Sequence, residues 1–162
     1  MPLPDYLRRL RAKIGHDTVL MAGVICVVIN EAGQVLAQRR SDDGKWCLPG
    51  GILDPDEHPG PGATREVLEE TGLLVEVERL VGVYSKPQKQ EVVLTFRCRV
   101  TGGQLTSTAE TRECRFFSPA DIPINTLPKH RQRVEDALLN QPQAIIRDQR
   151  SSSEEDQRLP LP

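Results

Sequence analysis

The sequence predicts one α+β domain in which an acidic helix lies between β-strands. Residues 19–29 are nearly all apolar and rich in β-branched side chains, which is typical of a strand buried on both faces. Residues 91–100 alternate with a period of two, as a half-buried strand does. Between these runs, three glutamates at helical spacing precede Gly72. Strands before and after such a helix predict a mixed sheet sandwiched between helices.

Length, charge and cysteine usage narrow the class of protein. A chain of 162 residues is long enough for one domain with a proper core and too short for two ordinary ones. Its net charge of -2 gives no broad basic surface, so no stable nucleic-acid binding is expected. The four cysteines form no Cys-x-x-Cys pair and are expected to be small buried hydrophobes in a reducing compartment.

No membrane association is expected either. The apolar run at 19–29 is much shorter than the roughly 20 residues that cross a bilayer, and the N-terminus lacks a cleavable signal pattern. A cytoplasmic location is therefore predicted.

The first element is a helix over residues 5–14. Leu7, Leu10 and Ile14 recur at helical spacing, and Gly15 ends the pattern. We expect this helix to lie on the domain as an N-terminal extension (1–17), with a solvated basic face rather than a membrane or nucleic-acid surface.

Strands and turns then alternate up to a closing helix. Strands are predicted at 19–29, 34–40, 74–84, 91–100 and 110–117, with turns at 30–33, 41–44, 101–104 and 118–123. A helix follows at 128–139 with Val134, Ala137 and Leu138 inward. The domain is therefore predicted over 18–140. Residues 141–162 are polar and low in complexity, so a disordered tail is predicted there.

The acidic helix has its own start and stop signals. Pro61 can open it, with Gly60 before it as N-cap, and Gly72 is placed as a left-handed C-cap. The glutamates Glu66, Glu69 and Glu70 share one arc at 100° per residue. The side chains expected on the opposite, apolar side are Ala63, Thr64, Val67 and Leu68.

This acidic arc is unfavourable without a cation. Like charges at these spacings repel by about 0.2 to 0.5 kcal/mol per pair, and they lie near the negative end of the helix dipole. A bound cation reverses both effects, and carboxylate oxygens are preferred ligands of Mg²⁺. The alternative is a purely structural, solvated acidic face.

The spacing around the glutamates carries a family resemblance. Gly51 is followed after five residues by Glu57, and after seven more by the run 65–73, which reads REVLEETGL. Together with the preceding run 48–51, LPGG, this resembles the Nudix box, and the resemblance covers about residues 18–140. It implies the Nudix fold and a hydrolase that uses Mg²⁺ or Mn²⁺. The implied substrate is a nucleoside diphosphate linked to another moiety, ADP-ribose-like or a (d)NTP, cleaved at its phosphoanhydride bond.

The resemblance also implies a set of metal ligands. Glu66 and Glu70 would be the principal ligands, with Glu69 a further ligand or the holder of metal-bound water. The main-chain carbonyl of Gly50 would be an additional ligand. Glu57 would either join the metal site through water or hydrogen-bond the loop.

Four further basic or small residues are candidates around that centre. Arg65 lies four residues before Glu69, so an ion pair between them would hold that carboxylate toward the metal, which makes Arg65 part of the catalytic group. Arg39 and Arg40 end a strand that borders the substrate in the family, and surface arginines are the alternative. Gly51, next to Gly50, would let the main chain approach a phosphate closely.

The general base is left open between two residues. Many Nudix hydrolases carry a glutamate shortly before an aromatic strand end, where it binds a further metal or serves as general base, and this spacing gives Glu110 first and Glu113 second. Trp46 is expected to pack in the core rather than stack on a base, and His58 to be solvated. The partner is a small-molecule nucleotide, and a homodimer is left open. The runner-up function is a non-catalytic Nudix domain that senses ADP-ribose or another nucleotide.

Overall fold

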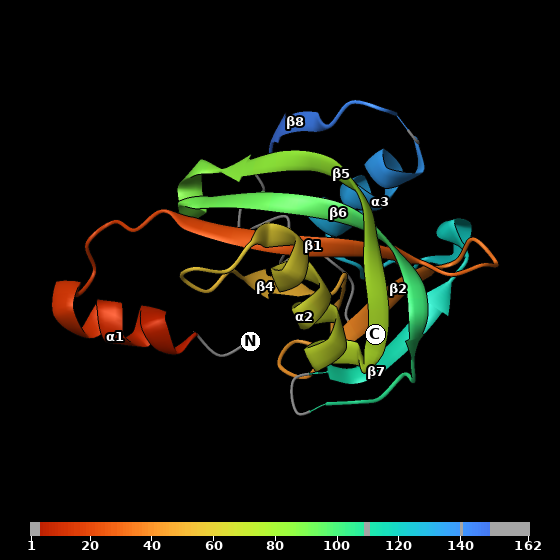
Figure 1. Ribbon diagram of the computed structural model, residues 1–162, viewed down its shortest axis with the longest axis horizontal. Helices are drawn as coiled ribbons and strands as arrows, with labels where there is room; N and C mark the ends of the chain where they lie inside the picture. Colours follow the sequence, from red (N-terminus) through yellow and green to blue (C-terminus); the bar gives the residue numbers. More distant parts are fainter. Residues whose placement is uncertain (1–3, 109–110, 140, 150–162) are drawn as a thin grey trace.

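The computed structural model describes residues 4–108, 111–139 and 141–149 (Figure 1). Its helices are α1 (Asp5–Ile14), α2 (Pro59–Thr71) and α3 (Pro128–Leu138), with 3-10 turns η1 (Pro87–Lys89) and η2 (Pro119–Asp121). Its strands are β1 (Met21–Ile29), β2 (Val35–Arg40), β3 (Trp46–Cys47), β4 (Gly50–Ile52), β5 (Leu73–Lys86), β6 (Glu91–Gly103), β7 (Thr111–Phe117) and β8 (Ile145–Asp148).

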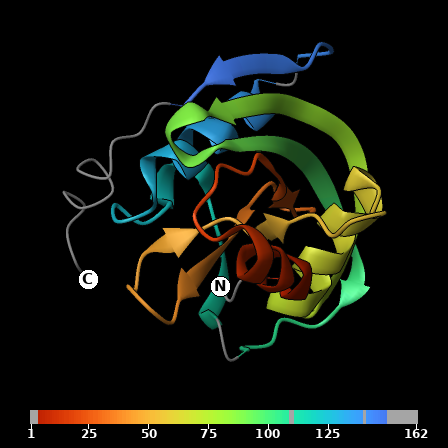
Figure 2. The same cartoon turned by 90° about the vertical axis from the view of Figure 1, so that its left-hand side faces the viewer.

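The strands form one mixed sheet. Its order is β3-β2-β1-β6-β5-β8, with β4 paired to β1 and β7 paired to β2. β1 runs parallel to β6, and β5 runs parallel to β8, whereas the other pairings are antiparallel. The long hairpin of β5 and β6 curves around one side of the molecule (Figure 2).

Helices cover both faces of this sheet, as predicted. Because successive side chains of β1 point to opposite faces, this buried strand contributes to two cores. One core lies under α2 and includes Val24, Cys26, Val28, Ala63 and Val67. The other lies under α3 and includes Val27, Ile29, Val35, Val134 and Ala137. The apolar content of residues 19–29 is therefore explained by burial on both sides.

The partners of β1 diverge along its length. Near its end, Ile29 pairs with Val35 of β2, whereas Gly23, Val24 and Ile25 pair with β4. β2 turns away to pair with β3 and β7. The sheet is thus split between β2 and β4, next to the C-terminal half of α2.

The end of the chain differs from the predicted disordered tail. Residues 145–148 form β8 on the edge of β5, and the Gln149 N–H donates to the Ser85 carbonyl at 2.8 Å. Composition does not predict this strand, because β8 forms by pairing with backbone groups that the edge strand β5 would otherwise leave unpaired. Burial of its own side chains contributes less. Residues 150–162 lie outside the described residues.

The structure also tests the predictions about the cysteines and about membrane-spanning segments. Cys26, Cys47 and Cys98 are buried, Cys114 is half-buried, and none forms a disulfide. Burial raises the pKa of the Cys47 thiol to about 12. Within the described residues, no helix is long and apolar enough to cross a membrane.

Candidate active site

Helix α2 begins earlier than its sequence signals suggest. It starts at Pro59 rather than Pro61, with the exposed His58 as N-cap. Both prolines fit because first-turn N–H groups have no partner within a helix. The first backbone bond runs from the Gly62 N–H to the His58 carbonyl at 2.9 Å. The helix is therefore not shortened by the two prolines. At its other end, Gly72 has φ 75° and caps the helix as predicted.

The acidic residues of α2 do not all face solvent. Glu66 and Glu70 are only 8% and 7% exposed and adjoin the buried Ala63 and Val67, while Leu68 is 45% exposed. The predicted separation of acidic and apolar faces is therefore wrong. Residues at i, i+3, i+4 and i+7 share a face, so a helix that buries Ala63 and Val67 also buries these two carboxylates.

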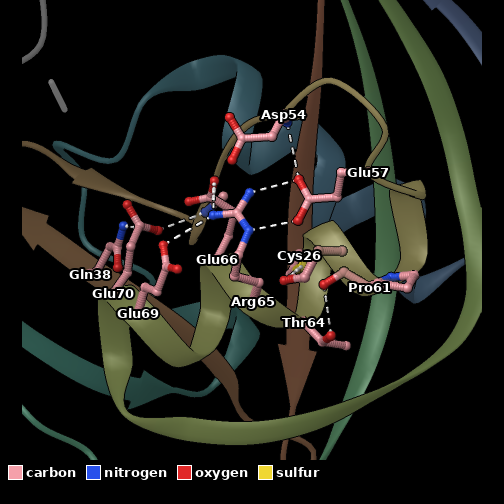
Figure 3. Close-up of polar contacts among 12 residues, drawn as sticks. Cys26, Gln38, Asp54, Glu57, Pro61, Thr64, Arg65, Glu66, Glu69 and Glu70 are labelled. Carbon is pink, nitrogen blue, oxygen red and sulfur yellow. Dashed lines mark hydrogen bonds and ion pairs between the residues drawn. The ribbon is translucent and has the colours of Figure 1, made fainter. Parts of the chain in front are cut away.

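Arg65 is the centre of the polar network around α2 (Figure 3). Its Nε donates to Glu57 Oε1 at 2.6 Å and its Nη2 to Glu57 Oε2 at 2.8 Å, which makes a bidentate pair. Its Nη1 lies 2.9 Å from Glu66 Oε1 and 3.0 Å from Glu69 Oε2. The predicted pair with Glu69 is confirmed, whereas the stronger pair with Glu57 was not predicted.

Glu57 connects this network to the preceding loop. Its Oε2 accepts the Asp54 N–H at 3.1 Å, which is one of the two alternatives that the sequence left open. Hydrogen bonds from Arg65 hold the pKa of the Glu57 carboxyl below its usual value. Glu57 is therefore an anionic anchor that fixes the position of Arg65.

The two adjacent glycines make room for the buried carboxylates. The Gly50 N–H donates to Glu70 Oε2 at 2.8 Å, and Gln38 Nε2 donates to the same oxygen at 2.8 Å. Gly50 has φ 148°, and a Cβ there would collide with the Val24 carbonyl oxygen. A Cβ on Gly51 would lie 2.5 Å from Glu66 Oε1. The loop thus approaches α2 closely only because these residues lack side chains.

The residues present fit a divalent cation, although the described side chains do not form a ready cluster of three or more metal-binding groups. Three carboxylates, those of Glu57, Glu66 and Glu69, contact the single Arg65 guanidinium, and the fourth, Glu70, follows on the same helix (Figure 3). Burial raises the pKa of Glu66, so a nearby cation would stabilise its charged form.

A further oxygen lies beside these carboxylates. Gln38 Oε1 is buried and has no hydrogen-bond partner among the described residues, and the amide of the same side chain contacts Glu70. An all-oxygen donor set of this kind suits Mg²⁺ or Mn²⁺. The contact that Gly50 makes with Glu70 is through its N–H, so its predicted carbonyl ligand stays a prediction.

A cavity of about 270 Å³ starts beside Glu70 and runs to α3. Gln38, Gly50 and Gly51 line it at the glutamate end. Basic side chains line much of the rest, namely Arg40, Lys86, Lys89, Lys129 and Arg133, with the acids Asp42 and Glu91 among them. A chain of net charge -2 thus concentrates positive charge where an anionic substrate could bind.

The sequence missed the residues that α3 contributes to this cavity. Lys129, His130 and Arg133 lie on a helix whose apolar spacing indicated only packing. Lys86 and Lys89 were visible in the loop at 86–90, but no motif marked them. The signal available in the sequence was the set of basic residues on α3, a helix that otherwise packs against the core.

His130 is a neutral side chain in the wall of the cavity. The Leu48 N–H donates to His130 Nδ1 at 3.0 Å. Burial lowers the pKa of the imidazole well below its usual value, and the nearby charge of Arg133 adds to this effect. Because Nδ1 accepts a hydrogen bond, the proton is assigned to Nε2.

The structure separates several candidates that the sequence grouped together. Gln38 and Arg40 line the cavity, whereas Arg39, on the opposite face of β2, donates its Nε to the Gly44 carbonyl at 3.2 Å. Glu113 is directly opposite Arg39 in the register, so it too points away from α2. Glu110 lies outside the described residues.

Trp46 shares the face of Arg39 and Glu113. Its ring packs edge-to-face on Phe117, with centroids 5.0 Å apart, and the side chain is 7% exposed. The prediction that it packs rather than stacks on a base is confirmed by this burial.

Comparison with known proteins agrees with this architecture. The model of the NUDIX domain family matches residues 19–138. A MutT-like protein of Streptomyces ambofaciens is 41% identical over 121 residues, which cover 75% of this chain and 77% of that protein. An ADP-ribose pyrophosphatase of Methanocaldococcus jannaschii is 33% identical over 120 residues, which cover 70% of this chain and 66% of that protein.

The solved structures give the same result. A NUDIX hydrolase from Nitrosomonas europaea superposes with a TM-score of 0.75 at 28% identity, covering 84% of this chain and 82% of that one. The range matched by the family model, 19–138, includes the acidic helix, the glycine pair and the residues that line the cavity. The chain therefore belongs to the Nudix family, and it is a Nudix pyrophosphohydrolase.

Proposed function

We propose that this enzyme uses Mg²⁺ or Mn²⁺ to hydrolyse the phosphoanhydride of a nucleoside diphosphate linked to another moiety, ADP-ribose-like or a nucleoside triphosphate. The observation that carries the proposal is the position of Glu70. Its carboxylate is bound by Gly50 and Gln38 and lines a cavity that is also lined by five basic side chains. A carboxylate for a cation and basic groups for phosphates thus line one cavity.

Each carboxylate has a separate part in this proposal. Glu66 and Glu70, both buried, would hold the cation together with Gln38 Oε1. When bound, the cation supplies charge neutralisation of the phosphate oxygens and acidifies water. Glu69 has the most exposed side chain of the three, at 59%, so it is the one that can accept a proton from the attacking water.

The remaining groups orient these carboxylates and the substrate. Arg65 holds Glu57, Glu66 and Glu69 through its three nitrogens, so it fixes where the carboxylates lie before a cation binds. Arg40 lines the cavity and would contact a phosphate oxygen, although it is ion-paired with Asp42 and Asp43. To contact the substrate, Arg40 would therefore exchange part of its pairing with the two aspartates for a phosphate, whose higher charge favours this exchange.

Product analysis over a nucleotide panel tests the proposal. The panel contains ADP-ribose, other nucleoside diphosphate derivatives and nucleoside triphosphates, each with and without Mg²⁺. We expect a nucleoside monophosphate and the remaining phosphoryl fragment only when metal is present. Glu70→Gln should lower kcat/KM on the order of a hundredfold or more, because the neutral amide keeps the shape and loses the charge. The matched control is Glu78→Gln, which removes an exposed carboxylate paired with Arg97. Full activity of Glu70→Gln would sink the proposal.

A further inference from the structure

The end of the cavity remote from Glu70 contains a buried arginine that forms no ion pair with the described residues. Arg133 is fully buried and lines the cavity. Its Nη2 donates to Gln149 Oε1 at 2.7 Å and its guanidinium lies 5.0 Å from the centre of the Tyr84 ring. Its Nε and Nη1 have no hydrogen-bond partner in the part of the chain that the structure describes. A buried cation with unused donors is costly unless a ligand satisfies it.

Lys86 is a second cation at the same end of the cavity. It is buried and ion-paired with Glu91, and both residues line the cavity. Glu91 is also the carboxylate whose charge acts on Arg133, so one acid faces two buried cations. Burial, together with the charges of Arg133 and Lys129, lowers the pKa of Lys86 to about 8. The excess of positive charge at this end therefore raises the energy of the protein without an anion.

The register of β1 shows that this end is separate from the acidic end. Ile25 pairs with Gly50, whose N–H binds Glu70, while Met21 pairs with Glu91, the partner of Lys86. Four residues of strand separate the two points, which is about 13 Å along β1. The two phosphorus atoms of one anhydride are much closer together than this, so a single diphosphate cannot occupy both ends.

We propose that Lys86 and Arg133 form an anion subsite that binds a phosphate group of the substrate remote from the cleaved anhydride. The inference rests on the proposed function and names a class of substrate for it, a nucleotide derivative with an additional phosphate. Arg133 would donate from Nε and Nη1, and Lys86 would exchange part of its contact with Glu91 for the phosphate. Glu70 and its neighbours would hold the anhydride at the other end of the same cavity.

Binding of inorganic phosphate to the full chain tests the subsite without catalysis. Calorimetric titration in EDTA compares the wild type with Lys86→Met, Arg133→Lys and Arg133→Met. Arg99→Met is the control, because it removes an exposed arginine paired with Glu76. We expect wild type and control to bind equally, and Lys86→Met and Arg133→Met to bind on the order of tenfold more weakly or worse. Urea unfolding of each variant checks folding. If Arg133→Met does not fold, the phosphate affinities of Lys86→Met and Arg133→Lys test the subsite instead.

Two results would overturn the subsite. One is the absence of phosphate binding to the wild type, and the other is equal binding by Lys86→Met and the Arg99→Met control. Turnover of matched pairs such as NADH and NADPH then tests remoteness, since the extra phosphate lies away from the anhydride. We expect a lower KM for the phosphorylated member, and loss of that preference in Lys86→Met. Equal KM values in the wild type contradict the remote phosphate.

The two proposals can fail separately. Phosphate binding is measured without metal, whereas turnover is measured with it. A chain that binds phosphate through Lys86 and hydrolyses no nucleotide refutes the proposed function and retains the subsite. A chain that hydrolyses nucleotides and binds no phosphate in EDTA refutes only the subsite.

Discussion

At the scale of single residues, Arg65 organises the site more than any one carboxylate. Its guanidinium meets Glu57 on one side and Glu66 and Glu69 on the other (Figure 3). The planar, always charged fork can hold two carboxylates in fixed orientation, which a lysine cannot do. Because the same oxygens are candidate metal ligands, Arg65 and a cation would compete for part of their charge and share the task of positioning them.

Replacing Arg65 should therefore weaken metal use rather than abolish folding. We expect Arg65→Lys to lower activity by roughly 10- to 100-fold and to raise the Mg²⁺ concentration needed for half-maximal rate. Activity measured over a Mg²⁺ titration checks this, with Arg97→Lys as a control because Arg97 pairs with Glu78 and does not contact the α2 carboxylates. An unchanged Mg²⁺ requirement would show that Arg65 does not position the ligands.

A second residue-scale prediction concerns pH. Burial and the charges of Arg133 and Lys129, opposed in part by Glu91, together lower the pKa of Lys86 to about 8. Its positive charge is present below that value and is lost as the pH rises through it. Metal-free phosphate binding should therefore weaken between neutral pH and about pH 9. Lys86→Arg keeps its charge, so it serves as the reference for the titration of phosphate itself. Parallel pH profiles for the two proteins would contradict the prediction.

At the scale of elements, α2 is positioned by its two ends. Two prolines in its first turn and a left-handed glycine at its C-cap set its limits, and the Gly50 and Gly51 backbone lies against its buried carboxylates. Because α2 buries Ala63 and Val67 against the sheet, Glu66 and Glu70 on the same face are buried too, and Glu70 lines the cavity. The packing of Ala63 and Val67 thus determines the direction in which the Glu66 and Glu70 side chains point.

Two glycines of this segment should respond differently to alanine. Gly72 has φ 75°, and a Cβ there would lie 2.5 Å from the Gln104 carbonyl oxygen. Gly72→Ala should lower the free energy of unfolding by about 1 to 3 kcal/mol. Gly60 has no atom within 4 Å of an added Cβ, so Gly60→Ala is the matched control and should be neutral or slightly stabilising. Urea unfolding compares them, and equal midpoints would refute the capping role.

At the scale of the whole molecule, Asp136 joins three elements. It is 3% exposed, and its Oδ2 accepts the Tyr84 hydroxyl at 2.9 Å. Arg147 of β8 donates to the same carboxylate from Nε at 2.8 Å and from Nη2 at 2.6 Å. β5, α3 and β8 are therefore fixed together by one buried acid, beside the wall that carries Arg133.

Neutralising this acid should destabilise the protein. Asp136→Asn removes the charge that pairs with Arg147 and leaves an amide that cannot accept all three hydrogen bonds. We expect a loss on the order of 3 kcal/mol in the free energy of unfolding. Chemical denaturation measures it, and Asp148→Asn is the control because Asp148 also lies on β8 but is exposed. A loss no larger than that of the control would show that the pair contributes little.

Much of the fold was predictable because its signals are local. The strand at 19–29, the alternation at 91–100, the Gly72 cap and the spacing from Gly51 to Leu73 each depend on neighbours in sequence. They predicted the mixed sheet between helices and placed Glu66, Glu69, Glu70 and Arg65 in one group.

What local signals could not predict are contacts made across the fold. The bidentate pair of Arg65 with Glu57 and the bond from Gln38 to Glu70 join residues whose distance depends on how the loop and sheet pack. Glu113 satisfied a family spacing, yet its place opposite Arg39 turns it away from α2, because strand parity is fixed by pairing register. β8 formed where composition predicted a tail, since an open sheet edge supplied its partners.

The sequence by itself determined the reaction class, because the box that identifies the family has its glycines, arginine and glutamates at fixed intervals within residues 51–73. Only the tertiary structure decided what surrounds that helix. Lys86 and Arg133 are far from the glutamates in sequence and carry no motif, yet the sheet and α3 bring them to the same cavity. Their proposed role depends on burial and on one acid, Glu91, lying beside two buried cations, which are properties of three-dimensional packing.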